Sequence, residues 1–237
     1  MTFEEEFTAF VKLFGGEKIP ETGTNPIADF FFCQREFIGE LKVLSADRTQ
    51  TTNERVQNLV REWISADPER AKEFVKRSPG AIELRQMPTE IQDKWLEILR
   101  DMLEQYVKAA NKQIGSTKVQ YGLRNARGLL LIFNEADQYH THPDSFRRVI
   151  ATLVRKRKQD GTLRYPNING MTFFSYESVK SHREQMSFWA NAQFPHSPDD
   201  DYSGMVWMQA QLQKAWYAYI SIRDGRPVRN NRDVPNE

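Results

Sequence analysis

The chain of 237 residues contains a single cysteine, Cys33, which excludes an internal disulfide framework and a cysteine-rich zinc site. It has no hydrophobic run long enough to span a membrane, and its acidic N-terminus is unlike a secretory signal peptide. It also lacks the glycine-rich phosphate loops and the nucleophile motif GxSxG. We therefore expect a cytoplasmic protein without membrane contact, whose chemistry does not depend on thiols or on a phosphate loop.

An excess of charge of either sign is also missing, because 33 Lys and Arg residues balance 32 Asp and Glu residues for a net charge of +1. This balance argues against strong nonspecific binding to nucleic acid, although phosphate binding depends on local charge. A basic stripe is expected along one helix, and its candidate nucleic-acid contacts are Arg147, Arg148, Arg155 and Lys156. Such a stretch is more often a solvated helix face, and it is compatible with modest, salt-sensitive binding.

Two apolar segments near the N-terminus carry charged residues where buried strands are expected. Asp29 lies in the first segment, and Glu40 and Lys42 lie in the second. Isolated charges in such positions cost several kcal/mol unless another group compensates them. Because side chains alternate along a strand, Glu40 and Lys42 point to the same face. A hairpin that turns through Gln34 and Arg35 would place Asp29 opposite Glu40.

Like charges placed opposite each other destabilise a sheet, so the predicted pairing of Asp29 with Glu40 favours a bound cation. Mg²⁺ binds through a few carboxylates and keeps several waters that a phosphate can replace, and Mn²⁺ is an alternative. Lys42 could orient or deprotonate an attacking water, or neutralise charge on the phosphorus oxygens. The competing interpretation is that Asp29 ends a strand and that Glu40 and Lys42 form an ordinary exposed ion pair.

The order Pro26-x-x-Asp29 followed by Glu40-x-Lys42 resembles the motif of the PD-(D/E)xK nuclease superfamily, which has the restriction-endonuclease-like fold. Pro26 is not adjacent to Asp29, which departs from the pattern of the superfamily. The resemblance implies that Asp29 and Glu40 hold one or two Mg²⁺ ions. It also implies that these residues and Lys42 cleave phosphodiester bonds of nucleic acid, for which we expect DNA.

The resemblance extends to two helices. The first helix of the superfamily often carries a glutamate that reaches the metal, and residues 2–14 have the spacing of an amphipathic helix. Glu6 is therefore a candidate catalytic residue and metal ligand. A later helix often supplies a glutamine or a lysine, for which Gln113 and Lys112 are the candidates. For Glu6 the alternative is a solvating or capping role, and for Gln113 and Lys112 it is a plain surface position.

The rest of the chain predicts one α/β domain with a restriction-endonuclease-like core, in which a mixed central sheet is flanked by helices. A helical insertion and a C-terminal helical extension are added to this core. The expected parts are residues 1–46 (first helix and metal-bearing strands), 47–117 (helical insertion and long core helix), 118–180 (remaining core strands and helix) and 181–237 (helical extension and tail). The insertion could be a lid, a DNA clamp or an oligomer surface, so a homodimer stays an open alternative.

Two other functions remain beside a Mg²⁺-dependent nuclease. The first is a non-catalytic regulator on the same fold that binds nucleic acid or protein, in which the charges form an internal ion-pair cluster. The second is an enzyme that acts on another phosphate ester, because a fold does not dictate a function. A different metal site at His140-x-His142 is disfavoured against a surface loop, since no third ligand is evident nearby.

Overall fold

The chain forms a mixed α/β structure around one sheet, in which the strands follow the order β1-β2-β3-β4-β5-β6-β7. The computed structural model describes residues 2–20, 25–44, 46–77, 87–135, 143–177, 185–194, 196, 201–225 and 227–230. The strands are β1 (Glu17–Lys18), β2 (Phe30–Phe32), β3 (Phe37–Leu44), β4 (Arg127–Asn134), β5 (Gly170–Glu177), β6 (Gln185–Gln193) and β7 (Val228–Asn230). The α/β class predicted from the sequence is therefore confirmed.

The sheet combines antiparallel and parallel pairs. Strand β2 runs antiparallel to β1 and β3, whereas β3, β4 and β5 are parallel to one another. Strand β6 is antiparallel to β5 and parallel to β7. Strand β4 is buried on both faces from Gly128 to Phe133, as expected of a parallel strand that is covered on both sides.

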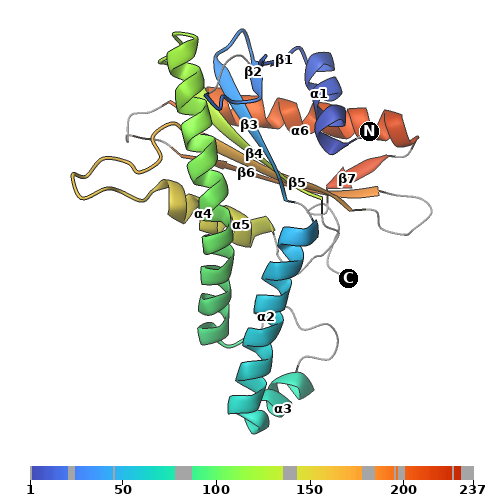
Figure 1. Cartoon of the computed structure of the whole chain (residues 1–237). Coiled ribbons are helices and arrows are strands. Elements are labelled where there is room, and N and C mark those ends of the chain that lie inside the picture. The colour runs from blue at the N-terminus through green and yellow to red at the C-terminus, as the bar shows by residue number, and fades with distance from the viewer. Residues whose placement is uncertain are drawn as a thin grey trace.

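Helices cover both faces of the sheet. They are α1 (Phe3–Leu13), α2 (Ala46–Ala66), α3 (Pro68–Arg77), α4 (Thr89–Gln120), α5 (Pro143–Val154) and α6 (Ser203–Asp224). Helices α4 and α5 pack on one face and α1 and α6 on the other, while α2, α3 and the first half of α4 extend away from the sheet (Figure 1). No helix in the described part of the chain is both long enough and apolar enough to cross a bilayer.

Each face of the sheet has its own apolar core because side chains alternate along the strands. On β3, Ile38 and Leu44 join the core beneath α4 and α5, whereas Phe37 and Leu41 join the core beneath α1 and α6. Glu40 and Lys42 follow the same alternation as Ile38. The alternation therefore places both charged side chains on the face that α4 covers.

Helix α1 begins as its sequence predicts. Thr2 and Glu5 form a capping box, in which the Thr2 hydroxyl accepts from the Glu5 N–H and the Glu5 carboxylate accepts from the Thr2 N–H. The long core helix expected within residues 47–117 is α4, which continues past residue 117 to Gln120. The start of α1 and the end of α4 therefore follow from the local sequence, and packing against other elements does not shift them by more than a few residues.

Two expectations about elements were wrong. The helix expected to carry the whole basic stripe is α5, which ends at Val154, before Arg155 and Lys156, because the chain then turns at Gly161 and forms a bridge between Arg157 and Leu163. The C-terminal extension was expected to be helical, yet it also supplies β6 and β7 to the sheet. The free edge of β5 accounts for the second difference, since an unpaired edge satisfies its backbone groups by adding a strand.

Candidate metal centre

A tight hairpin sets the geometry of the charged cluster. Strands β2 and β3 are joined by residues 33–36, and three of these, Cys33, Gln34 and Arg35, have positive φ values of 49°, 54° and 72°. Phe32 pairs with Phe37, so the register that continues from this pair places Asp29 opposite Glu40. The predicted turn and register are therefore confirmed, although non-glycine residues at positive φ cost about 1–2 kcal/mol each.

The Asp29 carboxylate is held by the backbone of the neighbouring strand. The Asp29 N–H donates to the Gly39 carbonyl at 3.1 Å, and the Leu41 N–H donates to Asp29 Oδ2 at 2.8 Å. Asp29 thus extends the hydrogen bonding between β2 and β3 by one residue before β2 begins at Phe30. Burial raises the pKa of Asp29, while the Leu41 N–H and the nearby Lys42 ammonium partly oppose this shift.

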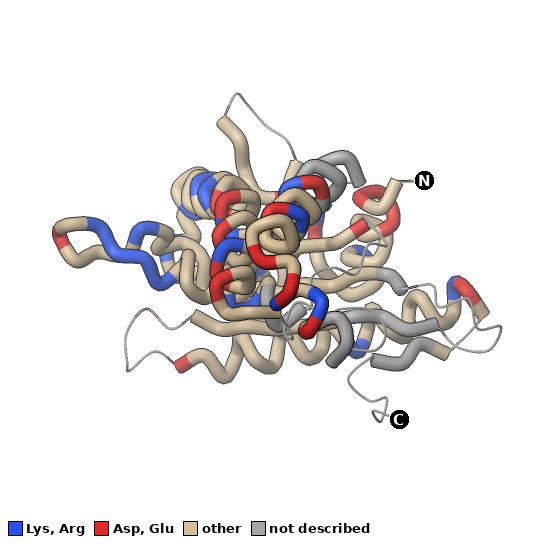
Figure 2. Tube along the Cα trace, turned by 90° about the horizontal axis from the view of Figure 1, so that it is seen from below, with Lys and Arg blue, Asp and Glu red and all other residues tan. Residues whose placement is uncertain are grey.

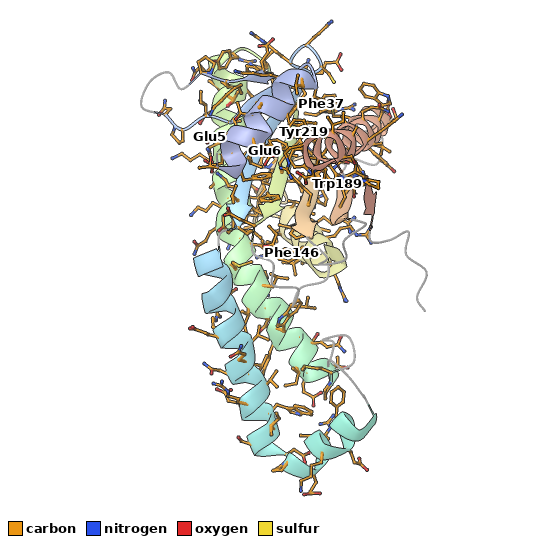
Figure 3. The ribbon with its side chains drawn as sticks, turned by 90° about the vertical axis from the view of Figure 1, so that its right-hand side faces the viewer. Glu5, Glu6, Phe37, Phe146, Trp189 and Tyr219 are labelled. Atoms are coloured by element: carbon orange, nitrogen blue, oxygen red, sulfur yellow. The ribbon has the colours of Figure 1, made fainter. Side chains whose placement is uncertain are left out.

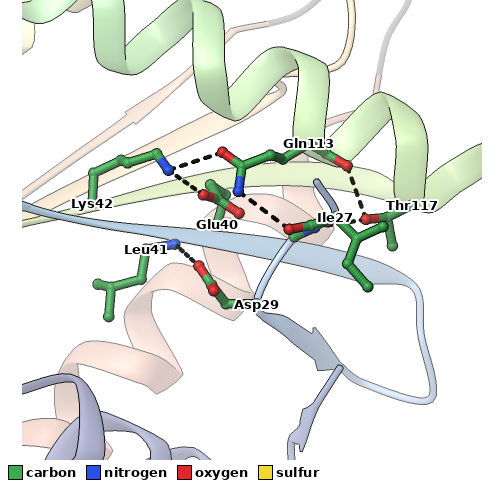
Figure 4. Close-up of polar contacts among 8 residues, drawn as sticks. Ile27, Asp29, Glu40, Leu41, Lys42, Gln113 and Thr117 are labelled. Carbon is green, nitrogen blue, oxygen red and sulfur yellow. Dashed lines mark hydrogen bonds and ion pairs between the residues drawn. The ribbon is translucent and has the colours of Figure 1, made fainter. Parts of the chain in front are cut away.

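Glu40, Lys42 and Gln113 meet beneath α4 (Figure 4). The Lys42 ammonium donates to Glu40 Oε1 and to Gln113 Oε1, the latter at 2.9 Å. The Gln113 side-chain N–H donates in turn to the Ile27 carbonyl at 3.2 Å, which lies two residues before Asp29. Gln113 therefore connects the lysine to the segment that carries the first carboxylate. Its predicted proximity to the site is confirmed.

Glu40 is an unusually destabilised carboxylate. Its side chain is 1% exposed, and its second oxygen, Oε2, is buried and accepts from no donor in the described part of the chain. The Glu40 carboxyl also lies within hydrogen-bond reach of the Asp29 carboxylate. Burial and the negative charge of Asp29 raise the pKa of Glu40 to about 8, and the Lys42 ammonium offsets this only in part. A cation beside Glu40 and Asp29 would lower the free energy of both ionised groups.

Thr117 is a supporting residue that sequence reasoning missed. It is buried one turn after Gln113 on α4, where its hydroxyl donates to the Gln113 carbonyl at 2.9 Å. The same hydroxyl accepts from the Ala28 N–H at 2.8 Å, so it ties α4 to the residue before Asp29. A threonine on the buried stripe of an otherwise apolar helix face was the available signal.

The structure does not bring Glu6 to this cluster. Helix α1 packs its phenylalanines on the opposite face of the sheet, and the Glu6 carboxylate pairs there with Arg223 of α6. Figure 3 shows Glu6 close to Tyr219 on this side of the molecule. The aromatic spacing of α1 determines which sheet face it covers, and this outweighs the acid-rich first turn. Lys112 is exposed and is rotated about 100° around α4 from Gln113.

The basic candidates divide between two elements instead of forming one helical stripe. Arg147 and Arg148 are exposed on α5, whereas Arg155 and Lys156 lie beyond its end. Figure 2 shows lysines and arginines along a loop that projects from the body of the molecule, and residues 155–158 belong to it. The Lys156 ammonium lies 3.3 Å from a carboxylate oxygen of Glu104 on α4. His140 and His142 lie outside the described residues.

Within the described ranges, no three His, Cys, Asp or Glu side chains lie together as a ready-made metal site. A cation here would therefore rest on Asp29 and Glu40 and complete its shell with water. This arrangement suits Mg²⁺, which keeps several waters when it binds one or two carboxylates. Comparisons with family models, curated proteins and solved structures found no match for this chain.

Proposed function

We propose that the protein is a Mg²⁺-dependent nuclease that hydrolyses phosphodiester bonds of nucleic acid, with DNA as the expected substrate. The observation that carries the proposal is the buried pair of carboxyl groups of Glu40 and Asp29 beside Lys42, in which Glu40 Oε2 accepts from no donor among the described residues. Helix α1 precedes the antiparallel β2–β3 hairpin, and α4, which follows α2 and α3, leads to β4 parallel to β3, an order compatible with the restriction-endonuclease-like fold with β1, α2 and α3 added. Carboxyl groups whose pKa is strongly perturbed by burial and by a charged neighbour cluster at functional sites, which supports this proposal.

Asp29 and Glu40 would hold the cation. A bound Mg²⁺ supplies Lewis acidity toward the phosphorus oxygens and lowers the pKa of a coordinated water. In the reaction, the oxygen of water forms a bond to phosphorus, the ester P–O bond breaks, and the leaving oxygen takes up a proton. Lys42, held by Gln113, would donate a hydrogen bond to the attacking water or to a phosphorus oxygen, where negative charge develops.

Exposed positive charge is available near the face that carries this cluster. Residues 155–158 follow α5, and Lys156 contacts Glu104 on α4, the helix that also carries Gln113. Arg155 and Lys158 are exposed on the same projecting loop. Local cations of this kind neutralise phosphates, so binding should weaken as salt concentration rises. This supports nucleic acid as the substrate class despite the neutral overall composition.

The decisive measurement is cleavage of single-stranded, duplex and branched DNA, and of RNA, with Mg²⁺ or Mn²⁺. We expect Asp29→Asn and Lys42→Ala to lower the rate by roughly 10²- to 10³-fold, as does the loss of other transition-state contacts. Lys108→Ala, which removes an exposed lysine from α4, is the matched control and should cleave like the wild type. Equal rates for all four proteins would overturn the proposal.

A non-catalytic binding protein is the second candidate, and one observation favours it. The Lys42 ammonium already pairs with Glu40 and Gln113, so part of the cluster is compensated internally. Calorimetric titration with Mg²⁺ separates the two candidates. A nuclease should show saturable binding that Asp29→Asn weakens. A binding protein should show no binding heat and the same Tm with and without a chelator.

A further inference from the structure

A cavity of about 400 Å³ opens at the end of the sheet where β4 begins. The last turn of α4, the turn before β4, the loop before β5 and the start of α6 form its walls. Its volume lies within the range of small-ligand sites in proteins. None of the residues of the Asp29 cluster lines it, so it is a separate feature of the molecule.

One wall of the cavity is rigidly built around Asn167. Its backbone N–H donates to Asn111 Oδ1 at 2.9 Å, and its side chain donates to the Asn111 carbonyl at 3.2 Å. Glycines allow this close approach, because a Cβ at Gly128 would lie 1.9 Å from the Asn167 carbonyl oxygen and one at Gly115 would lie 2.6 Å from its side chain. The cavity wall is therefore formed before any ligand arrives.

Positive charge dominates the cavity lining. Lys118, Arg124 and Arg127 contribute three cations, whereas Asp201 contributes the only lining carboxylate within the described residues. In this part of the chain neither Lys118 nor Arg124 makes an ion pair, and burial lowers the pKa of Lys118. The Asp201 carboxylate already accepts from the Ser203 N–H at 2.8 Å. An anion would compensate the excess positive charge.

The Arg127 guanidinium adds to this excess. One of its nitrogens donates to the Asp201 carbonyl, and another lies 2.8 Å from the position that a Gly204 Cβ would take. Gly204 is in the first turn of α6, which has no acidic residue of its own, and the Asp201 carboxylate on the Ser203 N–H is the negative charge that the described residues place at this helix end. One carboxylate does not balance Lys118, Arg124, Arg127 and the positive end of the helix dipole, so a further anion would be favourable here.

An aromatic ring stands at the edge of this basic cavity. Tyr202 lines it and is 47% exposed, and Val206, one turn further along α6, is also exposed. Single-stranded nucleic acid is commonly held by cations along its backbone and by aromatic rings on which its bases stack. The three cations suit a phosphate and the exposed ring suits a base, so together they favour a nucleotide over a simple inorganic anion.

We infer that this cavity binds the phosphate of a nucleotide through Lys118, Arg124 and Arg127, with the base stacked on Tyr202. Arg127 pairs with Phe37 in the sheet, three residues from Glu40, or about 10 Å along the strand. That span is roughly three nucleotides of a duplex strand at 3.4 Å each. The role of the cavity in holding a substrate strand rests on the proposed function, whereas nucleotide binding itself does not.

The test measures binding to the full chain in a chelator, so that no cleavage occurs. The probes are adenosine 5′-monophosphate, adenosine, inorganic phosphate, and a short oligonucleotide with or without a 5′-phosphate. We expect the monophosphate to bind at least tenfold more tightly than adenosine. Lys118→Gln and Arg124→Ala should each weaken its binding about tenfold or more, since each removes a charge-assisted contact. Tyr202→Ala should weaken nucleotide binding but not phosphate binding.

Lys214→Gln, which removes an exposed lysine from α6 outside the cavity, is the control and should bind like the wild type. Tighter binding of the phosphorylated oligonucleotide than of the monophosphate assigns the cavity to a strand end, and equal binding assigns it to a free nucleotide. Wild-type affinity in both Lys118→Gln and Arg124→Ala, with unchanged Tm, overturns the inference. Absence of cleavage with intact nucleotide binding would overturn the proposed nuclease function alone.

Discussion

The two faces of β3 differ in what they bury. Toward α1 and α6, Phe37 and Leu41 join a core built largely from aromatic rings, including Phe7 and Trp216. Toward α4, the same strand buries Glu40 and the stem of Lys42, whose side chain is 19% exposed. On one face the strand thus buries only apolar side chains, whereas on the other it buries a destabilised charged pair between the apolar Ile38 and Leu44. Substitutions on the two faces should therefore separate stability from activity.

The largest effect is expected from Trp216→Ala on the aromatic face. Trp216 is fully buried, and its ring packs edge-on against Phe10 with the centroids 4.9 Å apart. Loss of this ring should lower the free energy of unfolding by about 3–5 kcal/mol, because a cavity remains. Denaturant titration measures this change in the free energy of unfolding. Ile222→Ala, at an 84% exposed position of the same helix, should change stability little. If Trp216→Ala and Ile222→Ala lowered the free energy of unfolding equally, the aromatic face would not be the stabilising one.

Glu40→Gln should change how stability depends on pH. In the unfolded chain Glu40 loses its proton near 4.5, whereas burial and Asp29 raise its folded pKa to about 8. Unfolding therefore releases a proton between these values, so the wild type loses stability as pH rises through this window. Glu40→Gln should lose less stability than the wild type over this pH range. At pH 8 its Tm should be several degrees higher than that of the wild type.

The comparison for that prediction is the difference in Tm between variant and wild type at pH 5 and at pH 8, measured in a chelator. Glu36→Gln, in the exposed turn of the same hairpin, should follow the wild-type curve. Saturating Mg²⁺ should remove most of the difference at pH 8, since a bound cation compensates the ionised Glu40. Parallel curves for Glu40→Gln and wild type would show that the Glu40 carboxylate is not destabilised by folding.

Thr117→Val should lower both stability and activity. The change keeps the shape of the side chain but leaves the Ala28 N–H without its acceptor, which costs about 1–3 kcal/mol. Cleavage should fall further than stability accounts for, because Ala28 precedes Asp29. Thr152→Val removes the same type of hydroxyl contact from an exposed position on α5 and should be nearly neutral. Unchanged stability in Thr117→Val would contradict the anchoring role.

Gln113→Ala should have the smallest effect on stability and a measurable effect on rate. It removes the acceptor that holds the Lys42 ammonium, so we expect kcat to fall about tenfold, which corresponds to about 1.4 kcal/mol. Single-turnover cleavage measures this step. Gln120→Ala, at the exposed end of α4, is the matched control. An unchanged kcat would show that Lys42 does not need Gln113 for its position.

Local sequence signals predicted the hairpin better than they predicted distant contacts. The register that joins Asp29 to Glu40 follows from the length of the turn and the alternation of side chains. Gln113 was a candidate only because the resemblance to the nuclease superfamily implies a glutamine or a lysine on the long helix after the Glu40-x-Lys42 strand. Glu6 was a plausible ligand by the same reasoning, yet α1 packs on the other face of the sheet. No local pattern states which face a helix covers.

The C-terminal region shows the same limit. The apolar spacing of α6 was readable, but the pairing of β6 with β5 depends on an edge that forms only when the sheet assembles. The helix predicted to include Arg155 and Lys156 ends at Val154 because the Gly161 turn and the Arg157–Leu163 bridge compete with it. Such competition between local and tertiary contacts is decided by packing.

The sequence by itself determined the α/β class, the β2–β3 register and the common face of Glu40 and Lys42, because strand alternation and turn length are local properties. Only the tertiary structure decided that Gln113 and Thr117 of α4 close over these residues and that Glu6 does not. It alone gathered Lys118, Arg124 and Arg127 around one cavity. The physical reason is that burial, and therefore the cost of leaving a charge unpaired, exists only once distant segments pack together.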